Sequence, residues 1–333
     1  MKKIILSFIL AFAATFTATA QDNFADGPGW LWQISGNGLS QKSYLFGTCH
    51  GEGHNFTKEE VFSITGLEAS LNGIKTVLFE GGMNTETTNA DTAAIAAEVK
   101  KVTAFIANPG PEHFMPEGTN YESLFDSIQH FKRIDMVLTK LAERLNNGEY
   151  FKKSPRYWYS LLALTNLYQA EKLQTNVTYV DYILKQEAEE RGIDIGYVED
   201  ASKAGLTMLS SLFASIDTMS MKNQADALYH LLENIAHKDK QQKFLEGITK
   251  IYLKNDTCKM ESFIREANIV PGAESEDSQK ELLYDRNVAW IPVIKQNIAQ
   301  RPCMVAVGCR HLLGSESLIA LLRREGYTVE AVK

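Results

Sequence analysis

The residues most able to do chemistry are two histidines that end Gly-x-x-His tetrads near opposite ends of the chain. The tetrad at 47–50 reads Gly-Thr-Cys-His and ends at His50, and the tetrad at 308–311 reads Gly-Cys-Arg-His and ends at His311. Each tetrad directly follows an apolar run typical of a buried strand, Ser43–Phe46 or Cys303–Val307. Glycine permits a sharp turn as a strand ends, and ligand sites gather at the carboxyl ends of sheet strands. If these two strands are neighbours, both imidazoles reach one crevice.

Two glutamates follow other strand-like runs. Glu80 comes directly after the mostly apolar, β-branched run Ile74–Phe79, and Glu199 follows a shorter run that begins at Asp194. Carboxylates at this edge of a sheet can bind a metal or act as general bases. Simpler interpretations stay open, because a charged residue at a strand end is often only its first solvated position. A structural ion pair would equally explain Glu199.

The elements that must position these residues are strands at both ends of the sequence. The segments 30–34 and 43–48 flank a Gly-Asn-Gly turn, which predicts a hairpin. Thr57 to Glu60 resembles a capping box, and Val61, Ile64, Leu67 and Leu71 predict one short helix. Because a helix then separates the strand at 43–48 from the strand at 74–79, we expect these two strands to form a parallel pair.

The middle of the chain is mostly helical in its periodicity. Apolar stripes run from Leu124 to Leu141 and from Tyr157 to Tyr168, and the short strand at 194–200 interrupts them. The chain closes with a helix at 285–298, the strand at 303–307, a helix at 316–325 and a strand at 328–332. We therefore predict an α/β fold: a central mixed sheet formed by the N- and C-terminal segments, with a large, mostly helical insertion at about 88–300. Residues 21–333 are expected to form a single domain.

The first twenty residues resemble a cleaved export signal. Lys2 and Lys3 precede an apolar stretch at 4–16 that ends in Ala-Thr-Ala at 18–20. We expect a periplasmic or secreted protein, and no later run is long and apolar enough to predict a membrane span. Cleavage would remove two lysines and change the formal charge from −7 to −9, which argues against a nucleic-acid partner.

Four cysteines, at 49, 258, 303 and 309, are too few and too widely spaced for a disulfide scaffold. Cys49 and Cys309 lie within the two tetrads. If the tetrads meet, these sulfurs can pair, bind a metal or pack as small apolar groups. Packing is the interpretation favoured here, and no disulfide is predicted.

Several short motifs at both ends of the chain match one known family. They are Leu31-Trp32, Tyr44 to His50, Val77 to Glu80, Val307 to Gly314, and Leu321 to Val329. The step Asp285-Arg286-Asn287 and the pair Asp181 and Glu199 add to the match. On these residues the sequence resembles the TraB/PrgY/GumN group within the larger Tiki superfamily. The helical middle departs from the family pattern, so the resemblance does not indicate the substrate.

The resemblance implies a metal-dependent hydrolase of the metalloprotease type, which acts on a peptide or a small-molecule substrate. Carried over by motif, His50, Glu80 and His311 are the expected ligands of a divalent ion such as manganese, cobalt or zinc. Glu80 can instead be the general base with Glu199 as the third ligand. Arg286 would orient a carboxylate of the site or bind an anionic group of the substrate.

Two alternatives use the same residues. In the first, His50 activates water without a metal, as related erythromycin esterases suggest. In the second, the crevice binds haem or another ligand without catalysis, as in a haem-binding superfamily relative. The sequence contains no His-Glu-x-x-His helix, Gly-x-Ser-x-Gly elbow or phosphate-binding glycine loop, which argues against the chemistries of those motifs.

Overall fold

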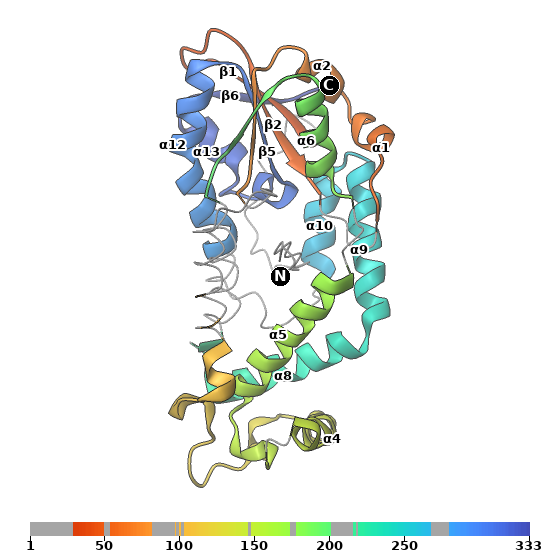
Figure 1. Cartoon of the computed structure of the whole chain (residues 1–333), viewed down its shortest axis with the longest axis vertical. Coiled ribbons are helices and arrows are strands. Elements are labelled where there is room, and N and C mark those ends of the chain that lie inside the picture. Colours follow the sequence, from red (N-terminus) through yellow and green to blue (C-terminus); the bar gives the residue numbers. More distant parts are fainter. Residues whose placement is uncertain are drawn as a thin grey trace.

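The computed structural model describes residues 29–49, 54–81, 97, 100, 103–145, 148–173, 178–200, 216–217, 219–267 and 280–333. A sheet with flanking helices forms one end of the elongated molecule, and helices of the insertion form the other (Figure 1). The expected export signal at 1–20 and His50 lie outside the described residues.

Six strands form one mixed sheet in the order β4-β3-β5-β2-β1-β6. Their bounds are β1 Leu31–Ser35, β2 Ser43–Thr48, β3 Thr76–Phe79, β4 Asp194–Tyr197, β5 Cys303–Gly308 and β6 Thr328–Ala331. The four strands β4, β3, β5 and β2 run parallel to one another, whereas β1 pairs antiparallel with both β2 and β6. The predicted fold class and the opening hairpin are confirmed.

One predicted pairing is wrong. The strands β2 and β3 run in the same direction, but β5 lies between them and pairs with both. In its register, Val305 of β5 stands beside Leu45 of β2 and Leu78 of β3. The reason lies in the composition of β5, whose first five residues are all buried, so that the strand needs a neighbour on each side and cover on both faces.

Helices cover both faces of the sheet. On one face lie α12 (Asp285–Gln300) and α13 (Leu318–Arg324), and on the other lie α1 (Lys58–Phe62), α2 (Leu67–Leu71) and α6 (Val180–Glu190) (Figure 1). Alternate side chains of β5 divide between the two cores. Met304 and Ala306 pack with α6, whereas Val305 and Val307 pack with α12 and α13.

The single helix expected after the capping box is two short helices. Thr57 accepts a hydrogen bond from the backbone N–H of Glu60 and the reciprocal bond is present, so the capping box itself is confirmed. The first helix ends at Phe62, and the second begins after Gly66, which adopts a left-handed conformation with φ of 78°. A Cβ at Gly66 would lie 2.4 Å from Val332 Cγ1, so the break brings the end of the chain close to this turn.

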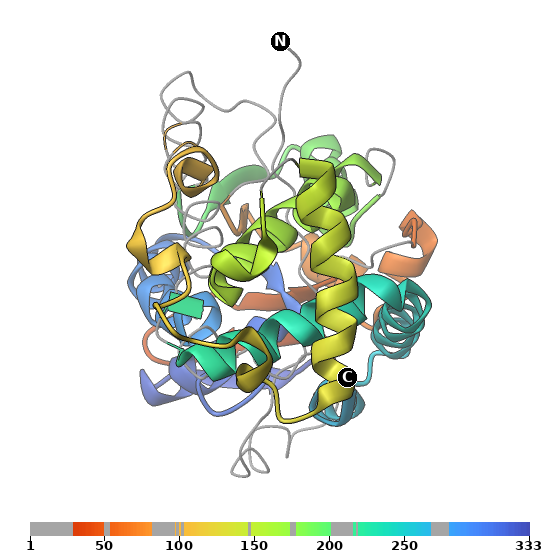
Figure 2. The same cartoon turned by 90° about the horizontal axis from the view of Figure 1, so that it is seen from below.

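The helical insertion has its own core. Its helices are α4 (Ile128–Leu145), α5 (Pro155–Leu173), α8 (Met221–Ala236), α9 (Lys238–Leu253) and α10 (Thr257–Ala267), with short 3-10 helices at Pro111–His113, Tyr121–Leu124 and Tyr150–Lys152. Leu124 therefore precedes α4 instead of opening its stripe. Residues of α4, α5 and α8 form one buried cluster, and Figure 2 shows α4 and α8 crossing at this end of the molecule.

The end of α9 connects the insertion to the sheet. Tyr252 donates its hydroxyl hydrogen to the carbonyl of Gly47 at 2.8 Å, and the indole N–H of Trp30 donates to the carbonyl of Tyr252 at 2.9 Å. The two rings also stack, with centroids 5.2 Å apart. All three residues are buried, so this contact fixes the insertion against the carboxyl end of β2.

The tetrad glycines have a different role from the predicted sharp turn. Gly47 lies within β2, Gly308 is the last residue of β5, and neither has a positive φ. A Cβ on Gly47 would lie 2.9 Å from Leu312 Cδ1 and 3.2 Å from Cys309 Cα, and a Cβ on Gly308 would lie 3.2 Å from Glu80 Oε1. Glycine is needed at both positions because other groups approach the backbone closely.

The substitution Gly47→Ala should therefore lower the free energy of unfolding by about 1–3 kcal/mol, because the added methyl group meets backbone as well as side chains. Urea unfolding of both proteins measures this change. The matched control is Gly73→Ala, whose Cβ meets no neighbour within 4 Å and which should change stability by less than about 0.5 kcal/mol. Equal effects of the two substitutions would contradict the close-approach explanation.

Candidate functional site

Four of the five predicted site residues meet at the carboxyl edge of the parallel strands. Glu80 directly follows β3, Glu199 lies two residues beyond β4, and His311 lies in a 3-10 turn, η5 (Cys309–Leu312), directly after β5. Arg286 reaches the same edge from the first turn of α12. The fifth residue, His50, is two positions beyond the last residue of β2 and lies outside the described residues.

Glu80 stands at the centre of the group. Its Oε1 accepts the backbone N–H of Gly308 at 2.6 Å and lies 3.4 Å from Nε2 of His311. Its Oε2 accepts a hydrogen bond from Arg286 at 2.9 Å. The carboxylate thus joins the end of β3 to the end of β5 and to α12.

Arg286 bridges the two glutamates. It contacts Glu199 through both Nη2 and Nε, and the indole N–H of Trp290 donates to Oε2 of Glu199 at 3.0 Å. Burial lowers the pKa of Arg286, but the charges of Glu80 and Glu199 outweigh this effect and raise it, so the guanidinium stays charged. Both oxygens of Glu199 therefore accept hydrogen bonds from residues of α12.

Arg286 and Trp290, which bind Glu199, lie one turn apart on α12. The guanidinium of Arg286 lies 4.6 Å from the ring of Trp290, a cation–π distance, and the same ring lies 4.5 Å from the imidazole of His311. A π-helical segment at Lys280–Tyr284, η4, leads directly into α12, and such segments are frequent near functional sites. The start of α12 is thus shaped to bring its first two turns to the sheet edge.

His311 is buried, with 4% of its side chain exposed. Its Nδ1 lies 2.6 Å from Oδ1 of Asn287, and Nδ2 of Asn287 donates to the carbonyl of Glu316 at 2.9 Å. Burial is the main cause that lowers the pKa of His311 to about 3, and the charges of Arg286 and Arg310 contribute in the same direction against the opposing effect of Glu80. The imidazole is therefore neutral at physiological pH.

A second buried group lies next to the tetrads. The hydroxyl of Thr48 donates to Oδ1 of Asp181 at 2.7 Å, which connects the end of β2 to the first turn of α6. Cys49 and Cys309 are buried in the same core cluster. A hydrogen bond to Cys309 and burial raise the pKa of the Cys49 thiol well above its usual value. Both residues carry free thiols in the structure and pack within this cluster.

Two residues of the site were not identified as functional from the sequence. Asn287 and Trp290 hold His311 and Glu199, but amide and indole groups on a helix resemble ordinary packing residues. The available signal was position, because both lie within one turn of Arg286, and Asn287 completes the Asp-Arg-Asn step.

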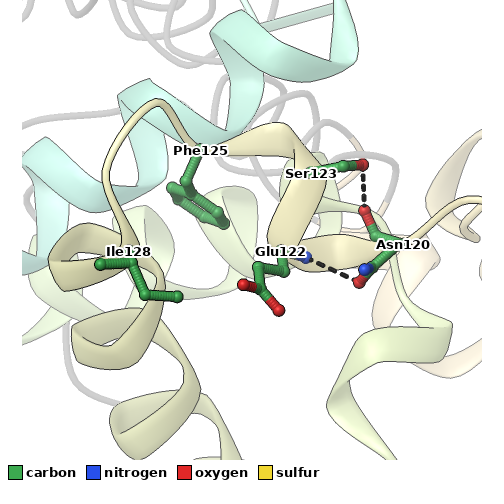
Figure 3. A pocket seen from close by; sticks show the side chains of 5 residues that line it. All are labelled: Asn120, Glu122, Ser123, Phe125 and Ile128. Atoms are coloured by element: carbon green, nitrogen blue, oxygen red, sulfur yellow. Dashed lines mark hydrogen bonds between the residues drawn. The ribbon is translucent and has the colours of Figure 1, made fainter.

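Other features of the described residues add no second site. Among them, no group of three or more His, Cys, Asp and Glu side chains is arranged to hold a metal ion, and no helix is long and apolar enough to cross a membrane. A depression lined by Asn120, Glu122, Ser123, Phe125 and Ile128 lies in the helical insertion (Figure 3). Its polar groups bond within their own turn, since Asn120 accepts from Glu122 and Ser123.

Comparison with known proteins identifies the family of this chain. The chain is 22% identical to Metalloprotease TIKI2 of Danio rerio over 339 residues, which cover 90% of the chain and 60% of that relative. The chain therefore corresponds to about three fifths of the relative's length. No solved structure matches it. The model of the TraB/PrgY/gumN family matches residues 30–331, from the first strand to the last, and the chain belongs to this family.

Proposed function

We propose that this protein is an exported, metal-dependent hydrolase that cleaves an amide or ester bond. Family membership and the metalloprotease relative support hydrolysis, and the relative also favours a peptide as the substrate. The signal-like segment at 1–20 supports export to the periplasm or the medium.

The observation that carries the proposal is a close approach of two hydrogen-bond acceptors. The orientation of Asn287 is fixed because its Nδ2 donates to the carbonyl of Glu316, so its Oδ1 faces Nδ1 of His311. Nδ1 therefore carries the proton, and the neutral ring presents the lone pair of Nε2 to Oε1 of Glu80 at 3.4 Å. Two facing acceptors repel each other unless a cation lies between or beside them.

This arrangement fits a divalent cation such as manganese, cobalt or zinc. Nε2 of His311 and Oε1 of Glu80 would be two ligands, and His50, beyond the end of the neighbouring strand β2, would be the third. A ligand histidine commonly donates its second ring N–H to a fixed acceptor, as His311 does to Asn287. The bound ion would lower the pKa of a water molecule toward about 7 and polarise the carbonyl of the substrate.

The contacts divide the two glutamates between different roles. Glu80 points Oε1 at His311, whereas both oxygens of Glu199 are engaged by Arg286 and Trp290. We therefore assign Glu80 as the ligand and Glu199 as a positioning residue that fixes Arg286. Arg286 in turn fixes the second oxygen of Glu80, which keeps the first directed at His311.

Haem binding is the weaker proposal for this edge of the sheet. An axial histidine must project its Nε2 toward a flat macrocycle. His311 is instead buried between Trp290 and Glu80, and Asn287 holds its other nitrogen. A porphyrin would have to displace these residues, whereas a single ion and a water molecule would not.

The first test is the metal content of the full-length protein purified without chelator, measured by elemental mass spectrometry. We expect near-stoichiometric metal in the wild type and at least a tenfold loss in His50→Ala, Glu80→Gln and His311→Ala. The exposed histidine variant His237→Ala should retain the metal. Hydrolysis of a peptide and ester panel should follow the metal content and stop with a strong chelator.

Two outcomes would overturn this assignment. A wild-type protein without metal, even after supplementation with manganese, cobalt and zinc, would exclude metal-dependent chemistry and favour hydrolysis without metal. Full metal retention in His50→Ala would remove the first tetrad from the site.

A second prediction concerns the residue that orients His311. Asn287→Leu should weaken metal binding by about 10–100-fold, because the imidazole loses the acceptor that fixes its tautomer. Competition with a chromophoric chelator measures the affinity. The matched control on the same helix is Asn297→Leu, since the side chain of Asn297 donates to the carbonyl of Val293 one turn earlier. Equal losses of affinity in the two variants would argue against a specific role for Asn287.

A third prediction concerns pH. The pKa of His311 is about 3 in the folded protein and about 6.5 when unfolded, so between these values the unfolded state binds the extra proton. The stability that the neutral ring contributes is present above about pH 6.5 and falls as the pH decreases, by about 2 kcal/mol from pH 7 to pH 5.

Urea unfolding of the metal-free protein at several pH values tests this linkage. In His311→Gln the acid-dependent loss over this range should shrink by about 2 kcal/mol relative to the wild type, whereas His237→Gln should leave it unchanged. Parallel stability profiles for the wild type and His311→Gln would show that His311 does not titrate as described.

A further inference from the structure

We propose that Cys49 and Cys309 form a disulfide bond that joins the two Gly-x-x-His tetrads. The bond would link the chain just beyond β2 to the chain just beyond β5. It does not depend on hydrolysis or on a bound metal, but it rests on the export included in the proposed function, because a lasting disulfide needs an oxidising compartment.

The pairing of the strands places these cysteines side by side. In the parallel register, Thr48 stands opposite Gly308, and Cys49 and Cys309 are the next residues on each chain. Neighbouring strands lie about 4.8 Å apart, and a disulfide requires Cα atoms about 4.4–6.8 Å apart. The close approach of the chains at this edge is also evident at Gly47, whose added Cβ would lie 3.2 Å from Cys309 Cα.

The side chains also meet. Both side chains are buried in one core cluster between the sheet and α6, with Asp181 and Tyr252 nearby. The interaction with Cys309 is the largest cause of the raised pKa of the Cys49 thiol, which agrees with two neighbouring thiols.

The other two cysteines are not placed to compete. All four lie within the described residues. Cys258 is exposed on α10, and Cys303 begins β5 at the opposite edge of the sheet from Cys309, six residues earlier. At about 3.3 Å per residue this separation is close to 20 Å, far beyond the reach of a disulfide.

The oxidant would be a second disulfide, carried by a small molecule or by a thiol–disulfide oxidoreductase of an oxidising compartment. One cysteine attacks that disulfide as a thiolate and forms a mixed disulfide, and the second cysteine then displaces the carrier. The two cysteines together lose two protons and two electrons, and the carrier leaves as two thiols. Because both sulfurs are buried in the folded protein, the exchange takes place while the chain folds.

The bond would have a large effect on the unfolded state. Cys49 and Cys309 are 260 positions apart, so the disulfide would close nearly the whole chain into one loop. Long loops lose the most conformational entropy on closure. In the folded state the bond would hold together the two strand ends that carry His50 and His311.

The test begins with the full-length chain, reduced and unfolded, then refolded in a mixture of reduced and oxidised glutathione. Remaining thiols are alkylated under denaturing conditions, and a non-reduced digest is analysed by mass spectrometry. Before alkylation we expect an intact mass 2 Da below that of the reduced protein. After alkylation we expect a Cys49–Cys309 linked peptide and alkyl groups on Cys258 and Cys303. Reduction should lower Tm by at least about 5 °C.

Variants give the control. In Cys49→Ser/Cys309→Ser, Tm should no longer respond to the reductant, whereas Cys258→Ser should respond as the wild type does. Should the double variant fail to fold, the mass analysis of the wild type still decides the question. The proposal is overturned if both thiols are alkylated after oxidative refolding, or if either cysteine pairs instead with Cys258 or glutathione. It is also overturned if a chelator alone makes both thiols reactive toward the alkylating agent and the mass is not 2 Da lower, because a metal and not a disulfide would then protect them.

Discussion

The carboxylate of Glu80 is the group on which the arrangement of this sheet edge depends. It accepts the backbone N–H of Gly308 and a hydrogen bond from Arg286, and it faces His311, so it holds β3, β5 and α12 in one geometry. Such a contact is possible only because β5 lies directly beside β3 and because residue 308 has no side chain. The side chain of Glu80 is partly buried, with 23% of it exposed, and a carboxylate removed this far from water is destabilising without such partners.

In the tetrads, strand pairing determines where the residues lie, and the glycines leave room for neighbouring groups. The described parts of the two tetrads lie at one edge because β2 and β5 are parallel neighbours, a result of the apolar composition of both strands. Their glycines make room at that edge, Gly47 for the turn after β5 and Gly308 for Glu80. The glycine in each tetrad is therefore required by the packing of neighbouring segments, and in the second tetrad this packing places His311 beside Glu80.

The sequence predicted the strands, the mixed sheet and the grouping of Glu80, Glu199, Arg286 and His311, because periodicity is local and carboxyl ends of parallel strands share an edge. It did not predict that β5 separates β2 from β3, since pairing depends on contacts between segments far apart in the chain. The helix break near Gly66 was missed for a similar reason, because Gly66 packs against Val332 from the far end of the chain. The hydrogen bonds of Asn287 and Trp290 also join distant segments, and no local pattern encodes them.

The helical insertion contributes a wall beside this edge. The hydroxyl of Tyr252 binds the carbonyl of Gly47, and Asp181 of α6 binds Thr48, so both contacts end on the tetrad that carries His50. The groups proposed to react come from the sheet strands and α12, whereas this wall comes from segments in the helical middle. A change in that middle can therefore alter what lies against the site while Glu80, Arg286 and His311 keep their contacts. Under the proposed function, substrate choice and bond cleavage are carried by different parts of the chain, which is how one fold can serve several substrates.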